Sequence, residues 1–241
     1  MLVTNAETGT NICEVGDGLY RINTPLPIPG QEFSFNQYLL LADEPLLFHT
    51  GLRGLFPHVR HAVASVMPVE KLRHISFSHV EADECGSLNL WLEAAPNAAP
   101  LCGAVAAMVS VADLADRAPR GLADGETVDL GGRIVRWLDA PHVPHGWECG
   151  YLYEETAGTL FCGDLLTQPG TGARPLVEDD ILGPSEAFRR PMDYYAHAPT
   201  TQAILARIAA TEPETLACMH GSAWRGKGGD MIRALAGALA A

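Results

Sequence analysis

The segment Ser78-His79-Val80-Glu81-Ala82-Asp83-Glu84-Cys85-Gly86 decides the interpretation of this sequence. It follows the apolar run Ile75-Ser76-Phe77 and leads into a predicted helix at 83–95. His79, Glu81 and Asp83 occupy alternate positions, and alternate side chains of an extended segment point to the same side. These three ligand-type side chains can therefore converge on one cavity. The plainer interpretation is a polar loop in which Asp83 only caps the following helix.

Three more polar groups follow predicted strands further along the chain. His142 and His145 lie in the loop that follows the strand at 134–138. Asp164 comes directly after the apolar run at 159–163, and His220 directly after the run at 215–219. Ligands collect at strand ends in layered folds, so the four strand-end groups predict a common pocket.

Short strands followed by helices are predicted along the whole chain. The expected strands are 18–22, 37–41, 45–49, 71–78, 100–102, 127–130, 134–138, 150–154, 159–163 and 215–219. The expected helices are 56–67, 83–95, 105–115, 200–210 and 230–240. Clusters of strands, each followed by helices, are typical of layered sheets with helices outside. No linker or low-complexity tract divides residues 1–241, so we expect a single domain.

The order of these groups resembles the metallo-β-lactamase superfamily. The shared pattern is His-x-(His/Glu)-x-Asp, then His, Asp and His, each after a strand, and the resemblance runs from Asn36 to His220. It implies an α/β (α+β) fold, the four-layer αββα metallo-β-lactamase-type sandwich built from two similar halves. It also implies two metal ions at one edge, between the sheets.

The glutamate at position 81 makes the chain similar to one branch of this superfamily. The usual zinc hydrolases carry His-x-His-x-Asp-His, whereas the Glu81 form resembles the flavodiiron and oxygen-binding di-iron proteins. The ligands implied by this resemblance are His79, Glu81 and His142 for one metal, Asp83 and His220 for the other, and Asp164 as the bridge.

The sequence leaves two questions about the metal ligands undecided. Glu84 stands where the di-iron branch commonly has histidine. It either binds the second metal or contacts that metal's ligands, which we favour, or it turns away and leaves that metal an open site. His142 and His145 compete for one ligand position. The family's spacing of a histidine two residues before proline favours His142, with His145 beside it or at the rim.

A carboxylate in place of an imidazole makes a metal site harder, which suits iron better than zinc. A bridging carboxylate also holds two metals close enough to share one small ligand. We therefore expect two metal ions, with iron the leading candidate and zinc or manganese the alternatives. We also expect Tyr194 and Tyr195 to cover the pocket and to supply a proton or an electron there, although packing is the commoner role of a buried tyrosine.

Composition and charge exclude several classes of protein. The chain has 16 basic and 29 acidic residues, a formal net charge of −13, which argues against a nucleic-acid partner or an anionic membrane surface. We see no apolar stretch approaching twenty residues and no basic, apolar leader at the N-terminus. The six cysteines form no CxxC pair and are interpreted as reduced thiols of a cytoplasmic protein.

The leading functional hypothesis is a stand-alone binuclear non-haem iron protein that binds, and as an enzyme reduces, dioxygen or nitric oxide. We expect the sandwich to use nearly all of the chain and to leave no room for a flavodoxin-like domain, so electrons would come from a separate donor. The alternatives are a hydrolase that directs a metal-bound hydroxide at an ester, lactone, thioester or amide, and a gas or redox sensor without turnover. A homodimer is compatible with the sequence, which does not demand one.

Overall fold

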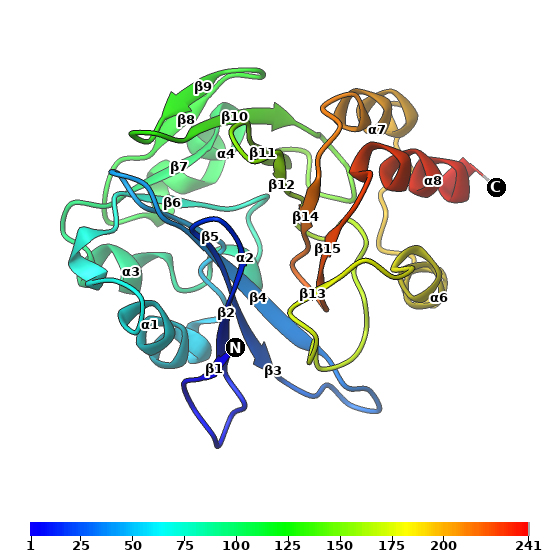
Figure 1. Ribbon diagram of the computed structural model, residues 1–241. Coiled ribbons are helices and arrows are strands. Elements are labelled where there is room, and N and C mark those ends of the chain that lie inside the picture. Colours follow the sequence, from blue (N-terminus) through cyan, green and yellow to red (C-terminus); the bar gives the residue numbers. More distant parts are fainter. Residues whose placement is uncertain (241) are drawn as a thin grey trace.

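The computed structural model describes residues 1–240 of the 241-residue chain. Two β-sheets face each other, and helices cover both outer faces (Figure 1). The first sheet contains eight strands in chain order, antiparallel from β1 to β5 and parallel from β5 to β8. Its strands are β1 (Leu2–Val3), β2 (Asn11–Gly16), β3 (Leu19–Pro25), β4 (Ser34–Leu40), β5 (Leu46–Phe48), β6 (His74–Ser76), β7 (Ala99–Gly103) and β8 (Arg120–Leu122).

The second sheet contains seven strands in the order β13-β15-β14-β12-β11-β10-β9. Its strands are β9 (Thr127–Asp129), β10 (Ile134–Asp139), β11 (Gly150–Glu154), β12 (Thr159–Phe161), β13 (Leu176–Val177), β14 (Thr215–Ala217) and β15 (Ala223–Arg225). Strands β12 and β14 are parallel neighbours, as are β5 and β6 in the first sheet. The carboxyl ends of such a pair lie at the same edge of a sheet.

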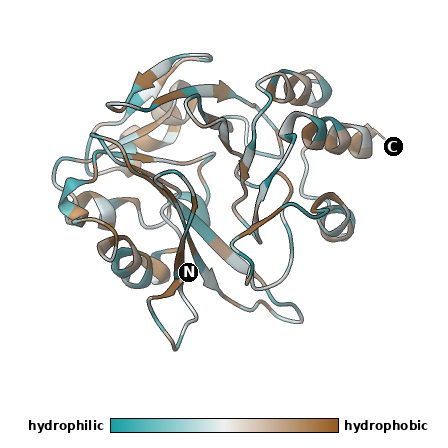
Figure 2. Ribbon diagram, in the orientation of Figure 1, coloured by the Kyte–Doolittle hydropathy of each residue, from teal (hydrophilic) through white to brown (hydrophobic). Residues whose placement is uncertain are grey.

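Helices from the two halves of the chain cover opposite faces of the sandwich (Figure 1). The helices are α1 (Phe56–Ala64), α2 (Ala82–Cys85), α3 (Leu88–Ala94), α4 (Ala104–Ala106), α5 (Ala112–Leu114), α6 (Leu182–Met192), α7 (Thr201–Ala209) and α8 (Gly228–Ala240). Teal and brown mix along the outer helices in Figure 2, as expected for helices that turn one face to a sheet and the other to water. Within residues 1–240, no helix is both long and apolar enough to cross a membrane.

Three hydrophobic clusters separate the four layers. Strand β4 contributes side chains to two of these clusters. Leu39 packs toward the helices of the first half, while Tyr38 and Leu40 pack toward the second sheet. Strand β12 does the same in the second sheet, with Phe161 in the cluster between the sheets and Leu160 under the helices. This alternation follows from the two-residue period of a strand. The predicted four-layer αββα sandwich is confirmed.

Some predicted elements differ from the structure. The helix expected at 83–95 is two helices, α2 and α3, because Gly86 and Ser87 between them are poor helix formers. The helix expected at 105–115 is broken by a π-helical turn at Ala107–Val111. Helix α6 was not predicted, since Gly183, Pro184 and Pro191 within it suggest a loop.

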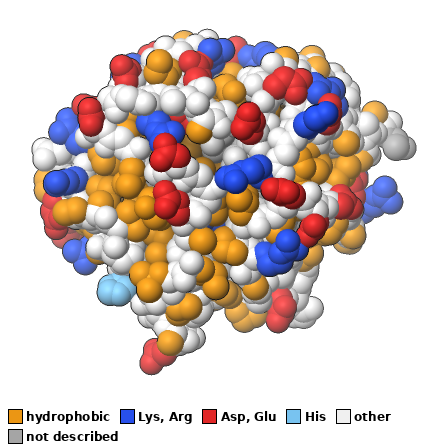
Figure 3. Space-filling model, viewed as in Figure 1, with side chains coloured by type: hydrophobic (Ala, Val, Ile, Leu, Met, Phe, Trp, Pro, Cys, Tyr) orange, Lys and Arg blue, Asp and Glu red, His pale blue; other side chains and the backbone are white. Residues whose placement is uncertain are grey.

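Charged side chains are mixed on the face of the molecule in Figure 3. Lysine and arginine lie among aspartate and glutamate there, with hydrophobic side chains between them. This face shows no continuous basic surface of the kind that binds a phosphate backbone.

Candidate metal centre

The first half of the chain supplies its ligand-type side chains from a short segment after β6. Glu81 is in the extended conformation, with φ −138° and ψ 164°, and helix α2 begins at the next residue. The extended backbone directs His79 and Glu81 to one side. Asp83 and Glu84 lie in the single turn of α2.

The second half supplies three more groups from loops at strand ends. His145 lies between β10 and β11, Asp164 follows β12, and His220 follows β14. Because β12 and β14 are parallel neighbours, Asp164 and His220 meet at one edge of their sheet.

Two glycines permit the close approach of backbone that this meeting requires. Gly163, next to Asp164, has φ +48°, and a Cβ there would lie 2.7 Å from the Ser78 hydroxyl oxygen. Gly221, next to His220, has φ +83°, and its Cβ would lie 2.6 Å from Cβ of Gln168. Only glycine adopts such conformations in such confined space without strain.

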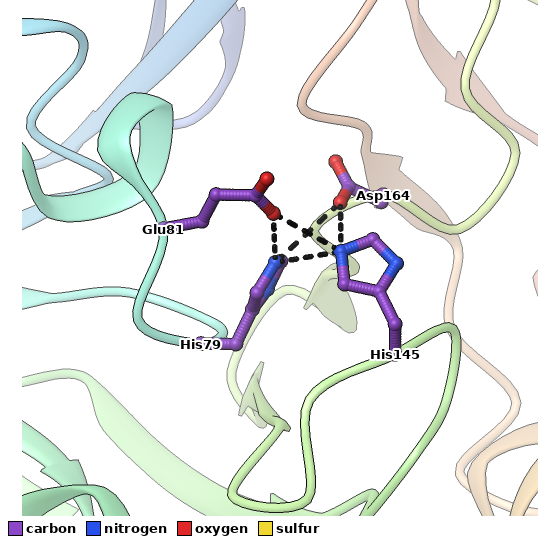
Figure 4. Close-up of side chains that lie close together, drawn as sticks. All are labelled: His79, Glu81, His145 and Asp164. Carbon is purple, nitrogen blue, oxygen red and sulfur yellow. Dashed lines mark hydrogen bonds and ion pairs between the residues drawn. The ribbon is translucent and has the colours of Figure 1, made fainter. Parts of the chain in front are cut away.

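Four side chains point toward a common centre (Figure 4). Nε2 of His79 lies 2.9 Å from Oε2 of Glu81 and 3.0 Å from Nε2 of His145. Nε2 of His145 lies 3.1 Å from the same oxygen of Glu81. Oδ2 of Asp164 lies 3.7 Å from the His79 nitrogen and 3.5 Å from the His145 nitrogen. Two imidazoles and two carboxylates thus place one ligand atom each within 4.8 Å of one another, which suits a first metal position.

A second group of side chains adjoins the first through Asp164. Its Oδ1 lies 3.3 Å from Nε2 of His220, and that nitrogen is 3.5 Å from Oδ2 of Asp83. Glu81, Asp83 and Glu84 also bring carboxylate oxygens within 4.8 Å of one another. The two oxygens of Asp164 therefore face different groups, as a bridging carboxylate between two metals would.

The structure corrects the preference for His142. That residue is exposed, and its backbone turns through φ +66° while its N–H donates to the carbonyl of Gly146 at 2.8 Å. His145 joins the cluster instead, because its Nδ1 is bonded to the carbonyl oxygen of Tyr194 at 3.0 Å and its Nε2 faces His79. The spacing of histidine and proline in the loop did not reveal which imidazole the turn directs inward.

The three clustered histidines share one arrangement. Nδ1 of each is occupied away from the centre, by the Ser78 hydroxyl at 3.0 Å for His79, by the Tyr194 carbonyl at 3.0 Å for His145 and by the Ser34 carbonyl at 2.9 Å for His220. A partner at Nδ1 fixes the ring and leaves Nε2 free for a metal, which is how metal-binding histidines are held in proteins. The residues present therefore fit a metal ion.

His49, which follows β5, supports His79 through a serine hydroxyl. It is fully buried, and its Nε2 lies 3.1 Å from the Ser78 hydroxyl that contacts His79. Burial lowers the pKa of His49 to about 3, so its ring stays neutral. Its backbone is held at φ +64°, a strained conformation for a residue other than glycine.

The protonation of the cluster follows from its pairings. Hydrogen bonds from His145 and His79 lower the pKa of Glu81 to about 2. Burial disfavours charge on His220, but the neighbouring carboxylates of Asp164 and Asp83 outweigh it and raise the pKa of that imidazole to about 10. Burial, together with the charges of Asp164 and Asp83, raises the pKa of Glu84 well above its ordinary value. Without metal, the cluster therefore retains protons at neutral pH.

A small cavity of about 220 Å³ opens onto the cluster. Its walls combine the ligand-type side chains with an apolar rim. The rim is formed by Ile28, Phe33, Phe188, Met192 and Tyr194.

The structure separates the two tyrosines that we expected at the pocket. Tyr194 lines the cavity, and its hydroxyl donates to the backbone carbonyl of Asp164 at 3.3 Å. Tyr195 does not line it. That ring packs in the hydrophobic cluster of the second half, with the Arg189 guanidinium 5.9 Å from its centre. Adjacent residues of this loop point different ways, so the expectation for Tyr195 at the pocket is wrong.

A model of the ODP family beta lactamases matches residues 33–221, which include every ligand-type residue of the cluster. The chain belongs to the ODP beta-lactamase family. The resemblance inferred from His79, Glu81 and Asp83 is confirmed. A search of the curated proteins finds no match to the sequence.

The fold of this ODP family member is shared with flavodiiron cores. Rubredoxin oxygen:oxidoreductase from Desulfovibrio gigas is 18% identical with a TM-score of 0.77, over 95% of this chain and 60% of that one. The Flv1 flavodiiron core from Synechocystis sp. PCC6803 is 20% identical with a TM-score of 0.80, over 96% of this chain and 61% of that one. Residues 1–254 of diflavin flavoprotein A 5 from Nostoc sp. PCC 7120 are 16% identical with a TM-score of 0.83, over 96% of this chain and 95% of that fragment. The chain thus spans about 60% of the first two neighbours.

Proposed function

We propose that this protein holds two iron ions and uses them to bind and reduce dioxygen or nitric oxide, with electrons from a separate donor. The observation that carries the proposal is the position of Asp164, whose two oxygens face two adjoining sets of ligands. Its Oδ1 is buried without a hydrogen-bond partner, and a cation would compensate by coordinating that oxygen. Membership of the ODP family and the flavodiiron fold support the same proposal.

The donor set favours iron. On one side are His79, Glu81, His145 and Asp164, and on the other Asp83, Asp164 and His220, with Glu84 beside them. Mixed imidazole and carboxylate ligands suit iron and manganese, whereas structural zinc sites favour thiolate and imidazole. Two iron ions held here would supply the binding position for the diatomic molecule and change oxidation state during its reduction.

The cavity favours a small uncharged substrate over a hydrolysable one. At about 220 Å³ with an apolar rim, it has room for a diatomic molecule and few polar groups to orient an ester or an amide. Reduction of dioxygen to water consumes four electrons and four protons, so a proton source must be near. Burial raises the pKa of Tyr194, so its hydroxyl oxygen holds a proton at the wall of the cavity.

The electron donor is proposed to be another protein. Rubredoxin appears in the name of the Desulfovibrio gigas neighbour, and a small redox protein of that kind is the class we propose here. A cytoplasmic location and a homodimeric assembly remain predictions from the sequence.

The deciding experiment is metal analysis of protein purified without air, followed by titration with dioxygen and with nitric oxide. We expect two iron ions per chain, a visible absorption change on gas addition, and gas consumption that depends on added reductant. Gas binding without consumption would instead assign the protein to the sensors. A protein that takes up only zinc from iron-containing medium and shows no optical change would contradict the proposal.

A further inference from the structure

Glu84 is a buried carboxylate without a partner. Its side chain is fully inaccessible to solvent, and neither of its carboxylate oxygens has a hydrogen-bond partner within residues 1–240. The backbone around it is well fixed, since its carbonyl accepts a hydrogen bond from the N–H of Thr50 at 2.7 Å. The position of this carboxylate is therefore set by the fold.

The carboxylate of Glu84 faces the metal cluster. Its Oε1 lies 4.0 Å from Nε2 of His79, and an oxygen of Glu84 lies within 4.8 Å of ligand oxygens of Glu81 and Asp83. Burying an ionised carboxylate without hydrogen bonds is very costly, and two neighbouring carboxylates add to the cost. A divalent cation between these groups removes both penalties at once.

The charge balance of the cluster also favours divalent cations beside Glu84. The cluster contains four carboxylates, from Glu81, Asp83, Glu84 and Asp164, and three imidazoles. Four negative charges balance two divalent cations, so the loaded site is neutral. With a neutral imidazole at position 84, the same site would carry one positive charge more.

We propose that Glu84 is a ligand of the second metal, with Asp83, Asp164 and His220, and that this position favours Mn²⁺ or Fe²⁺ over Zn²⁺ more strongly than the first position does. The inference rests on the proposed two-metal function and adds the asymmetry of its two positions. The first position has two imidazoles, from His79 and His145, whereas the second has one. Carboxylate oxygens suit manganese and iron, and each added imidazole shifts preference toward zinc.

The test compares three proteins that differ at one position. Apoprotein prepared with a chelator is loaded with Mn²⁺ alone, and bound metal is counted by elemental analysis and by the coupled Mn²⁺ signal in electron paramagnetic resonance. Wild type should bind two ions that couple. Glu84→Gln keeps the size of the side chain and removes its charge, so the second ion should bind more than about 100-fold more weakly, beyond what the loss of an outer partner costs.

Glu84→His replaces the carboxylate ligand with an imidazole ligand. This variant should again bind two ions, but in competition between Zn²⁺ and Mn²⁺ its second position should take up zinc at least about tenfold more readily than wild type. Glu148→Gln is the matched control. Glu148 accepts the N–H of Val80 at 3.0 Å beside the cluster without entering it, so this variant should behave as wild type.

The outcomes separate the inference from the function on which it rests. If wild type and Glu84→Gln both bind two coupled ions with equal affinity, Glu84 is not a ligand, and the two-metal function stands. If Glu84→His leaves the competition between zinc and manganese unchanged, the selectivity is wrong. If wild type itself binds a single ion, the proposed function fails and the inference fails with it.

Discussion

Nε2 of His145 lies 3.0 Å from Nε2 of His79, and the Nδ1 of each ring is bonded on its far side. The carbonyl of Tyr194 can only accept a hydrogen bond, so the proton of a neutral His145 is on Nδ1 and its Nε2 carries a lone pair. Once Nε2 gives up the proton that it shares with Glu81, its lone pair and the carboxylates of Glu81 and Asp164 converge on one point.

The two histidines of the 139–145 loop should differ sharply in their effect on metal binding. His145→Ala removes an imidazole from the first position, so affinity for the first ion should fall by about 100-fold or more. His142→Ala changes an exposed side chain and should leave affinity within about twofold of wild type. Competition with a chromophoric chelator measures both. Equal losses in the two variants would show that the loop rearranges on metal binding.

Asp164 should matter to both metals. Asp164→Ala removes the carboxylate shared by the two positions, so the protein should lose both ions or, if it retains them, their magnetic coupling. Elemental analysis and electron paramagnetic resonance report these separately. Asp113→Ala, an exposed substitution in α5, is the control and should bind both ions with coupling intact. Two fully occupied, coupled ions in Asp164→Ala would show that the bridge is assigned wrongly.

The partner of His79 should influence the metal without touching it. Ser78→Ala removes the hydroxyl between His79 and His49, so the His79 ring loses its fixed orientation, and affinity for the first ion should fall about 10- to 100-fold. Ser76→Ala is a matched control, because Ser76 is a buried serine on β6 whose hydroxyl has no partner. A similar loss in both variants would indicate damage to the strand rather than to the pairing.

The sequence predicted the fold and most of the cluster because both depend on local patterns. Clusters of strands followed by helices predicted the layers, the family resemblance implied the four-layer sandwich, and the i, i+2 spacing of His79 and Glu81 predicted their common direction. The choice between His142 and His145 depends on how one loop turns, and the histidine–proline spacing that favours His142 carries no information about that turn. That choice is made by a contact 49 residues away, between His145 and Tyr194, which no local pattern contains.

The supporting contacts were equally invisible in the sequence. Ser34 lies 186 residues from His220 in the chain, yet its carbonyl orients that imidazole. His49 precedes Ser78 by 29 residues and meets it because β5 and β6 are parallel neighbours. Such partners are determined by which strands pair, so they become predictable only once the topology is known.

Metal binding at the second position should release protons and strengthen with rising pH. Without metal, the pKa of His220 is about 10, so this imidazole is protonated at pH 7, whereas a metal ligand must be deprotonated. Each ion bound there must therefore displace at least one proton. The proton from His220 alone should make the affinity for the second ion rise about tenfold per pH unit between pH 7 and 9, and any proton displaced from Glu84 adds to that slope.

Calorimetric titrations in two buffers of different ionisation enthalpy count the protons released. His220→Ala lacks the imidazole, so it should bind the second ion more weakly and release fewer protons than wild type. His61→Ala, at an exposed histidine on α1, should release the same number as wild type. The slope is the decisive feature, because an affinity that does not rise between pH 7 and 9 would mean that His220 holds no proton to be displaced.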